Sequence, residues 1–389
     1  MELGSEIAFN DRTETKPRYS IEAIIAAVAA LALADSLGAP IEGMDMNEPS
    51  PNQFVKKVRE QFLDENGEYK GIDGHVENSR WSGTTDDTEQ ALFVFEVLAK
   101  KFNTKSEVGW EDVSEGLVAA FVDWASEEPK GIGGNTLAAA QAISENQISI
   151  EGLHEYREKQ GRLIIPSITG EFSYDCTYAP TNSAVPRAIS LGLAFPLLRL
   201  SKDCSLEDRL NILDVAAEDV TRITHGFDEC IESSQASSAL IYLLLSGMDK
   251  TNALELIKER YGNIVDEALG QMDQKDVWGG GAVTTLGVAL KSYELNNKPK
   301  EVILGAINAQ MSKWCKVENW SKNPGPSGPD TDSYAILAAA FVAAEFIGQQ
   351  RIGELQEFVS EMLPEGQDNL LDPLTTEIIE QRVSSALAG

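Results

Sequence analysis

Apolar residues recur every three or four positions along most of this 389-residue chain, the spacing that places them on one face of an α-helix. Alternation of apolar and polar residues, typical of a half-buried strand, is scarce, and its best candidates are residues 147–150 and 163–168. The pattern therefore predicts an all-α fold. The predicted helices span residues 21–37, 85–102, 110–126, 135–145, 184–200, 206–223, 228–245, 253–261, 282–295, 300–314, 331–347, 354–363 and 376–387.

The helical stretches follow one another without an internal repeat or a low-complexity linker, which indicates one domain. We expect a single compact multi-helix domain over residues 20–389, with residues 1–19 as a polar N-terminal arm. An apolar fraction of 42% supplies enough side chains for a core of this size. Ser20 and Gly38 are expected to begin and end the first helix, because serine caps helix starts and glycine terminates helices.

The chain has 32 basic and 62 acidic residues, a net charge of −30, and this excess limits its partners. A negative field of that size repels nucleic-acid backbones and anionic lipid surfaces, so we expect neither nucleic acid nor membrane as a partner. The four cysteines form no C-x-x-C pair, which argues against a structural zinc site and a disulfide framework. Because the first residues do not resemble a signal peptide, we expect a cytoplasmic protein.

Two short acidic segments each stand at the start of a predicted helix: Thr-Asp-Asp-Thr at residues 85–88 and Asp-Thr-Asp-Ser at residues 330–333. Both offer hydroxyl and carboxylate oxygens, the ligands that hard cations such as Mg²⁺ prefer. Either segment alone is also explained by helix capping and by the helix dipole. With Glu42, just past the first helix, they supply five carboxylates, whose repulsion two divalent cations would nearly neutralise. The sequence therefore predicts a two-metal site.

These segments belong to an ordered series of motifs. Residues 34–42 resemble GD-x-x-G-x-x-x-E, residues 85–88 are T-D-D-T, and residues 131–136 resemble a G-x-G-x-T loop. Farther on, residues 182–191 loosely match N-G-x-x-M-R-x-x-P-L, residues 224–225 are T-H, and residues 328–333 resemble G-G-D-T-D-T. In this order the motifs resemble those of the ADP-ribosylglycohydrolases.

The resemblance implies a dinuclear metal site. Six residues would bind two Mg²⁺, with Mn²⁺ as the alternative: Thr85, Asp86, Asp87, Asp330, Asp332 and Ser333. Glu42 would lie in a flap over the metals, where it would ligate one of them or act as general base on the attacking water. Asp86 and Asp87 would also stabilise the positive charge that develops at C1″ of the ribose as the acceptor leaves.

The resemblance also places the substrate against several loops. The residues that would contact it are Gly131, Gly133, Gly134, Tyr178, Asn182, Ser183, His225 and Gly280. Asn182 and Ser183 would cradle the diphosphate, and His225 would reach the ribose or the diphosphate. Tyr178 or Tyr174 would stack on adenine. Each of these residues has a simpler alternative in a turn or in local packing.

Some positions depart from the family motifs. Ala34, Ser183 and Pro186 replace glycine, glycine and methionine, which leaves the substrate details open but retains the metal ligands. Arg187 is expected to pair with a buried carboxylate rather than with the substrate. Residues 313–328 form a longer link than is usual in the family, and we expect them to shape the acceptor side.

The expected activity is Mg²⁺-dependent hydrolysis of the N- or O-glycosidic bond between ADP-ribose and an acceptor, with ADP-ribosyl-arginine on proteins as the leading substrate. Acceptors with serine, a nucleobase or a small metabolite would share this core chemistry. One alternative is an immunity protein that neutralises an ADP-ribosyltransferase toxin by hydrolysis or by direct binding through residues 1–19. Another is a non-catalytic family member, against which the intact set of oxygen ligands argues.

Overall fold

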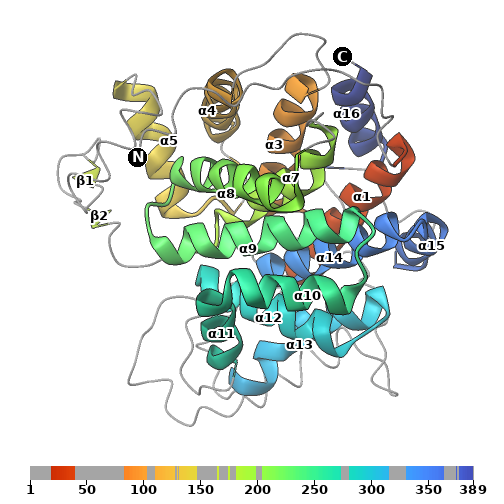
Figure 1. The fold of residues 1–389 in the computed structure, drawn as a ribbon. Coiled ribbons are helices and arrows are strands. Elements are labelled where there is room, and N and C mark those ends of the chain that lie inside the picture. The colour runs from red at the N-terminus through yellow and green to blue at the C-terminus, as the bar shows by residue number, and fades with distance from the viewer. Residues whose placement is uncertain are drawn as a thin grey trace.

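Helices make up nearly all of the described chain, which confirms the predicted all-α fold (Figure 1). The computed structural model describes residues 19–39, 83–102, 110–127, 129, 131–146, 164–165, 174–175, 181–198, 204–272, 280–314, 330–362, 374 and 376–388. Within these residues the strands are β1 (Ile164–Ile165) and β2 (Tyr174–Asp175), which pair antiparallel.

The helices of the first half are α1 (Ile21–Gly38), α3 (Asp86–Phe102), α4 (Trp110–Ser126), α5 (Gly134–Asn146), α7 (Val185–Ala194) and the 3₁₀ turn η2 (Phe195–Leu197). Those of the second half are α8 (Leu206–Arg222), α9 (Asp228–Leu245), α10 (Lys250–Arg260), α11 (Gly262–Gln271), α12 (Ala282–Leu295), α13 (Pro299–Trp314), α14 (Thr331–Gly348), α15 (Ile352–Met362) and α16 (Thr376–Ala388).

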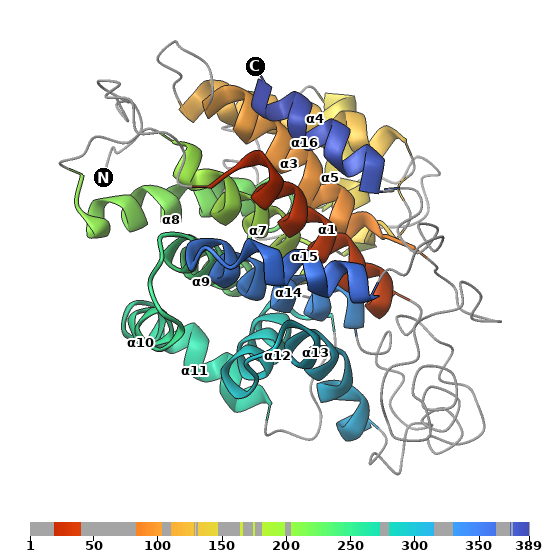
Figure 2. The same cartoon turned by 90° about the vertical axis from the view of Figure 1, so that its right-hand side faces the viewer.

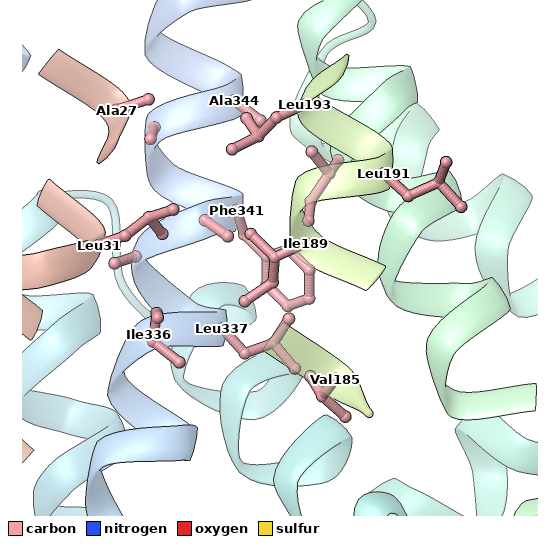
Figure 3. Packing of buried hydrophobic residues seen from close by; sticks show 14 of the residues in the cluster. Ala27, Leu31, Val185, Ile189, Leu191, Leu193, Ile336, Leu337, Phe341 and Ala344 are labelled. Atoms are coloured by element: carbon pink, nitrogen blue, oxygen red, sulfur yellow. The ribbon is translucent and has the colours of Figure 1, made fainter. Parts of the chain in front are cut away.

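Helix α14 lies at the centre of the core, between α1 and α7. Both α1 and α14 are rich in alanine, whose small side chain lets two helices approach closely. Figure 3 shows Leu31 of α1 on one side of α14 and Ile189 of α7 on the other. Helix α9 packs on α7, α8 and α14, while α3 packs on α7, α4 and α16 (Figures 1 and 2). This arrangement brings the N-terminal ends of α3 and α14 to the C-terminal end of α1.

Two of these helices, α1 and α14, are long and apolar enough to cross a membrane if length and composition alone are considered. In the structure 83% of α1 and 89% of α14 is buried inside the protein. Burial of that extent is what a core helix of a folded domain shows, and it explains why neither helix has a wide polar face.

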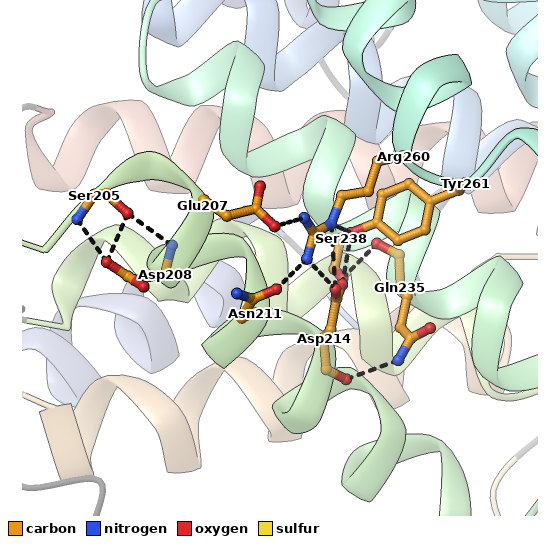
Figure 4. A network of polar contacts seen from close by, with 9 residues as sticks. All are labelled: Ser205, Glu207, Asp208, Asn211, Asp214, Gln235, Ser238, Arg260 and Tyr261. Carbon is orange, nitrogen blue, oxygen red and sulfur yellow. Dashed lines mark hydrogen bonds and ion pairs between the residues drawn. The ribbon is translucent and has the colours of Figure 1, made fainter.

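A polar network joins α10 to α8, and Gln235 of α9 also takes part in it (Figure 4). The Arg260 guanidinium pairs with Glu207 at 2.6 Å and with Asp214 at 2.7 Å, and the Tyr261 hydroxyl donates to Asp214 at 2.5 Å. Hydrogen bonding to these acids raises the pKa of Arg260 against the opposing effect of burial. These ion pairs and this hydrogen bond hold α10 and α8 together.

The structure corrects some predicted helix bounds. Helix α10 begins three residues earlier than predicted, because the Asp249 side chain accepts the Asn252 N–H at 3.1 Å and caps it. The predicted helix 184–200 ends as α7 at Ala194 and continues as η2, because Pro196 lacks an N–H and its ring clashes with a preceding carbonyl. Helix α11 was not predicted. Of the predicted strands, 163–168 includes β1, and 147–150 lies outside the described residues.

Candidate metal centre

The N-terminal end of α3 is capped by a side chain from α1. Asp35 is fully buried, and its carboxylate accepts the N–H groups of Thr85 at 2.9 Å and of Thr88 at 3.2 Å. It also accepts both hydroxyls, from Thr85 at 2.8 Å and from Thr88 at 2.5 Å. A helix start leaves unpaired N–H groups that a carboxylate satisfies well. Asp35 therefore fixes both the direction of α3 and the orientation of the Thr85 hydroxyl.

The N-terminal end of α14 is held against the C-terminal end of α1. The Thr331 hydroxyl donates to the Gly38 carbonyl oxygen at 2.8 Å. A Cβ atom on Gly38 would lie 2.5 Å from the Cα atom of Asp332, so only glycine allows this approach without a shift of backbone. The glycine that was predicted to end the first helix thus also positions an acidic residue of the second cluster.

The two acidic clusters meet in space. Carboxylate oxygens of Asp87, Asp330 and Asp332 all lie within 4.8 Å of one another. The Ser333 hydroxyl donates to Asp87 Oδ2 at 2.5 Å, and the Thr85 hydroxyl is 3.3 Å from Asp332 Oδ2. Asp87 and Asp332 are buried, and Asp330 is partly exposed. The structure thus brings together oxygen donors that are more than 240 residues apart in the chain.

The electrostatics of the cluster favour a bound cation. Burial, followed by repulsion from Asp86, Asp330 and Asp35, raises the pKa of Asp87 well above its ordinary value. Burial also raises the pKa of Asp35, although its four hydrogen bonds oppose that effect. A divalent cation among these carboxylates would remove the repulsion. Since the donors are all oxygen atoms, the set fits a hard cation such as Mg²⁺ or Mn²⁺.

One buried cation faces the cluster from the side of α7. Arg187 is fully buried, and burial lowers its pKa to about 10, so the guanidinium stays charged at neutral pH. We expected a carboxylate partner for it. Instead, Arg187 Nη1 donates to the Gln90 side-chain oxygen, and Gln90 Nε2 donates to Asp86 Oδ2 at 2.8 Å. The link to the carboxylate therefore passes through an amide.

The glycine-rich loop before α5 lies against the cluster. Gly131 has a φ of 91°, and a Cβ atom there would lie 2.8 Å from Asp86 Oδ1. A Cβ atom on Gly133 would lie 3.2 Å from the Ser183 hydroxyl oxygen, and Gly134 is exposed as the first residue of α5. Of the predicted substrate residues, Gly131 therefore borders the acidic cluster, and Gly133 lies beside Ser183.

Asn182 is engaged within the protein. Its side-chain amide donates to the Thr285 hydroxyl at 2.9 Å, and its backbone N–H donates to the Gly280 carbonyl oxygen at 3.1 Å. These bonds fasten the loop before α7 to the start of α12. Asn182 and Gly280, both predicted to contact substrate, are thus neighbours, and Asn182 holds the loop in place.

His225 lies between two threonines. Its Nδ1 is 2.6 Å from the Thr224 hydroxyl, and its Nε2 is hydrogen-bonded to the Thr181 hydroxyl. The ring is buried and belongs to the turn between α8 and α9, beside the Thr181–Gly281 bridge. The structure therefore places His225 at the loop that carries Asn182 and Ser183.

Glu42 and Tyr178 lie outside the described residues, as does segment 315–329. Tyr174 belongs to β2, and its side chain is also outside the described part. Asp35, although it stands in the GD-x-x-G-x-x-x-E match, and Gln90 were not among the predicted site residues. An aspartate in an otherwise apolar, alanine-rich helix is a signal that could have indicated Asp35, because a buried acid needs partners.

Comparison with known proteins shows the family and the fold of the chain. The family model described as ADP-ribosylglycohydrolase matches residues 15–352. Among solved structures, the chain is similar to one titled "ADP-ribosylglycohydrolase-related protein complex", with a TM-score of 0.54 and 18% sequence identity. That match covers 96% of this chain and 99% of the other, and at this identity it shows the fold. No curated protein sequence matches the chain.

Proposed function

Since the chain belongs to the ADP-ribosylglycohydrolase family, we propose that it hydrolyses the glycosidic bond between ADP-ribose and an acceptor, with Mg²⁺ as its cofactor. The observation that carries the proposal is the convergence of Asp87, Asp330 and Asp332 within 4.8 Å. An enzyme of this kind needs a site that binds an anionic substrate although the chain itself is strongly acidic, and bound cations meet that need.

The residues that would hold two divalent cations are Thr85, Asp86, Asp87, Asp330, Asp332 and Ser333. When bound, such cations supply positive charge that orients ribose hydroxyls and polarises the attacking water. Glu42, from outside the described residues, would act on that water as general base. The carboxylates of Asp86 and Asp87 would stabilise the positive charge that develops at C1″ of the ribose.

The diphosphate would lie at the start of α5, beside Ser183. A helix start presents N–H groups and the positive end of the dipole to an anion. The Thr136 hydroxyl is buried in the first turn of α5 and has no hydrogen-bond partner within the described part of the chain. Gly133 and Ser183 are close enough to border one ligand together.

We propose arginine on a cytoplasmic protein as the acceptor. Asp228, Glu229 and Glu232 are exposed on the first turns of α9, immediately after His225. Burial and repulsion from Asp228 and Glu229 raise the pKa of Glu232, which indicates a negative field at this edge. Such a field attracts a guanidinium group. The toxin-binding alternative rests on residues 1–19, of which only Tyr19 is described, so no structural observation favours it.

The test is hydrolysis of a panel of proteins and peptides that carry ADP-ribose on arginine, on serine or on a nucleobase, with Mg²⁺ and with a chelator. We expect turnover of the arginine substrate with Mg²⁺, and its loss with the chelator and in Asp332→Ala. Asp266→Ala is the matched control, because Asp266 is exposed on α11. Full activity with the chelator, or in Asp332→Ala, would refute the proposed function.

A further inference from the structure

Arg187 connects the acidic cluster at the start of α3 to the turn that carries His225. On one side it reaches Asp86 of the acidic cluster through Gln90. On the other side Arg187 Nη2 donates to the Thr224 hydroxyl, which is hydrogen-bonded to His225. The chain of contacts runs from a carboxylate of the proposed metal site to the imidazole at the proposed substrate loop.

The same guanidinium also fixes two backbone segments. Arg187 Nη1 donates to the Ser183 carbonyl oxygen at 2.9 Å, and Nε donates to the Val220 carbonyl oxygen at 3.4 Å. Thus one side chain holds α3, the loop before α7 and the end of α8 in a single arrangement. The planar fork of arginine makes this possible, because its N–H groups point in fixed directions that a lysine ammonium cannot reproduce.

The donor pattern also orients His225. A guanidinium can only donate, so the Thr224 oxygen accepts from Arg187 and its single proton is free to point at His225 Nδ1. The ring proton then resides on Nε2, which points at Thr181. In this arrangement His225 donates to the Thr181 hydroxyl, and the ring is held beside the loop where a ligand would bind.

Among the residues that the structure describes, Arg187 donates to no carboxylate, and a buried arginine without such a partner is costly. Desolvation of such a charge is unfavourable, and an apolar side chain of similar volume is often as stable or more stable. Within the described residues its hydrogen-bond acceptors are neutral, and the nearby acids Asp86 and Asp87 act on it from a distance. Apart from the Phe121 ring, whose centroid is 5.9 Å from Arg187 Cζ, packing gives no reason for a charged group at this position.

We propose that Arg187 is a positioning residue that couples the metal-binding carboxylate Asp86 to the ligand-binding orientation of His225. The inference rests on the proposed function for the identity of the ligand, and it adds that both sites depend on one buried cation. Loss of the guanidinium fork should weaken metal binding and ligand binding together. Loss of the contact through Gln90, the metal arm, should weaken mainly metal binding. Loss of the contact through Thr224, the histidine arm, should weaken mainly ligand binding.

The test measures Mn²⁺ binding and ADP-ribose binding separately, by calorimetry, in the full-length protein. Gln90→Met removes the metal arm, Thr224→Val removes the histidine arm with almost no change of shape, and Arg187→Lys keeps the charge but loses the fork. Ser292→Ala is the control, since it removes one buried hydroxyl bond, to the Val302 carbonyl oxygen at 2.6 Å, between α12 and α13.

We expect Gln90→Met to weaken Mn²⁺ binding about 10-fold, the lower end of what a partner of a metal ligand contributes. Thr224→Val should weaken ADP-ribose binding by a similar factor, and Arg187→Lys should weaken both. Arg187→Lys with wild-type affinity for both probes would overturn the proposal, as would equal losses of both affinities in Gln90→Met and Thr224→Val.

Circular dichroism establishes that each variant is folded at the temperature of the titration. If Arg187→Lys does not fold, the two single-arm variants carry the test. The Mn²⁺ titrations need neither substrate nor turnover. A wild-type protein that binds Mn²⁺ but not ADP-ribose would refute the proposed function and the histidine half of this inference, while the metal half would be decided by Gln90→Met.

Discussion

Asp35→Asn separates the capping role of this residue from its effect on the Thr85 hydroxyl. One carboxylate oxygen, Oδ2, accepts three bonds at the start of α3, including the N–H groups of Thr85 and Thr88. The other oxygen, Oδ1, accepts the Thr85 hydroxyl at 2.8 Å. An asparagine will place its side-chain oxygen where Oδ2 lies in Asp35, because the opposite orientation would turn an NH₂ group toward the N–H groups of Thr85 and Thr88. The amide nitrogen then faces the Thr85 hydroxyl.

The expected loss of metal affinity follows from this reversal of the hydrogen bond between residue 35 and the Thr85 hydroxyl. The Thr85 oxygen must accept from the new amide, which occupies the lone pair that a cation needs. A partner of a metal ligand typically contributes 10- to 100-fold in affinity, about 1.4 to 2.8 kcal/mol at 1.4 kcal/mol per factor of ten. In the metal-free protein one charge-assisted bond is lost, about 1.5 to 3 kcal/mol. Removal of a charge that repels Asp87 offsets part of this loss.

The assay is calorimetric titration with Mn²⁺, together with urea unfolding in a chelator. Ser36→Ala is the control from the same helical turn, because the Ser36 hydroxyl is buried and donates to the Ala32 carbonyl oxygen at 2.8 Å, away from the cluster. We expect Mn²⁺ affinity to fall only in Asp35→Asn. Wild-type affinity in a folded Asp35→Asn protein, or equal losses in both variants, would refute this account of Asp35.

Three further predictions concern the same centre. Gly38→Ala should destabilise the protein to urea unfolding by about 1–3 kcal/mol, because its Cβ atom meets the Asp332 backbone. Gly270→Ala is the control, because a Cβ atom at residue 270 meets nothing within 4 Å. Gly131→Ala should weaken Mn²⁺ binding, because its Cβ atom would press on Asp86 Oδ1, and unchanged affinity in calorimetry would contradict this. The raised pKa of Asp87 means that this carboxyl stabilises the metal-free protein most below its ordinary pKa of 3.8, and that this contribution is lost as pH rises through the raised value. Mn²⁺ binds the deprotonated form, so the gain in melting temperature from Mn²⁺ should grow with pH, and a constant gain would count against the assignment.

Local chemistry allowed much of the fold to be predicted. The helical spacing of apolar residues indicated most helices, and the Ser20 side chain caps α1 as expected, accepting the Ala23 N–H at 3.3 Å. The acids at the starts of α3 and α14 were visible because hydroxyl and carboxylate residues at a helix start form a short, contiguous pattern. These features depend on neighbours within about one helical turn, which is why sequence alone determines them.

Other features depend on contacts between distant segments. Asp35 and Thr85 are 50 residues apart, and Arg187 and Gln90 are 97 residues apart. No local pattern shows that the end of α1 lies between two helix starts, or that a buried arginine bonds to an amide instead of a carboxylate. Tertiary packing decided these partners, because burial requires each polar group to find a donor or acceptor wherever the folded chain places one.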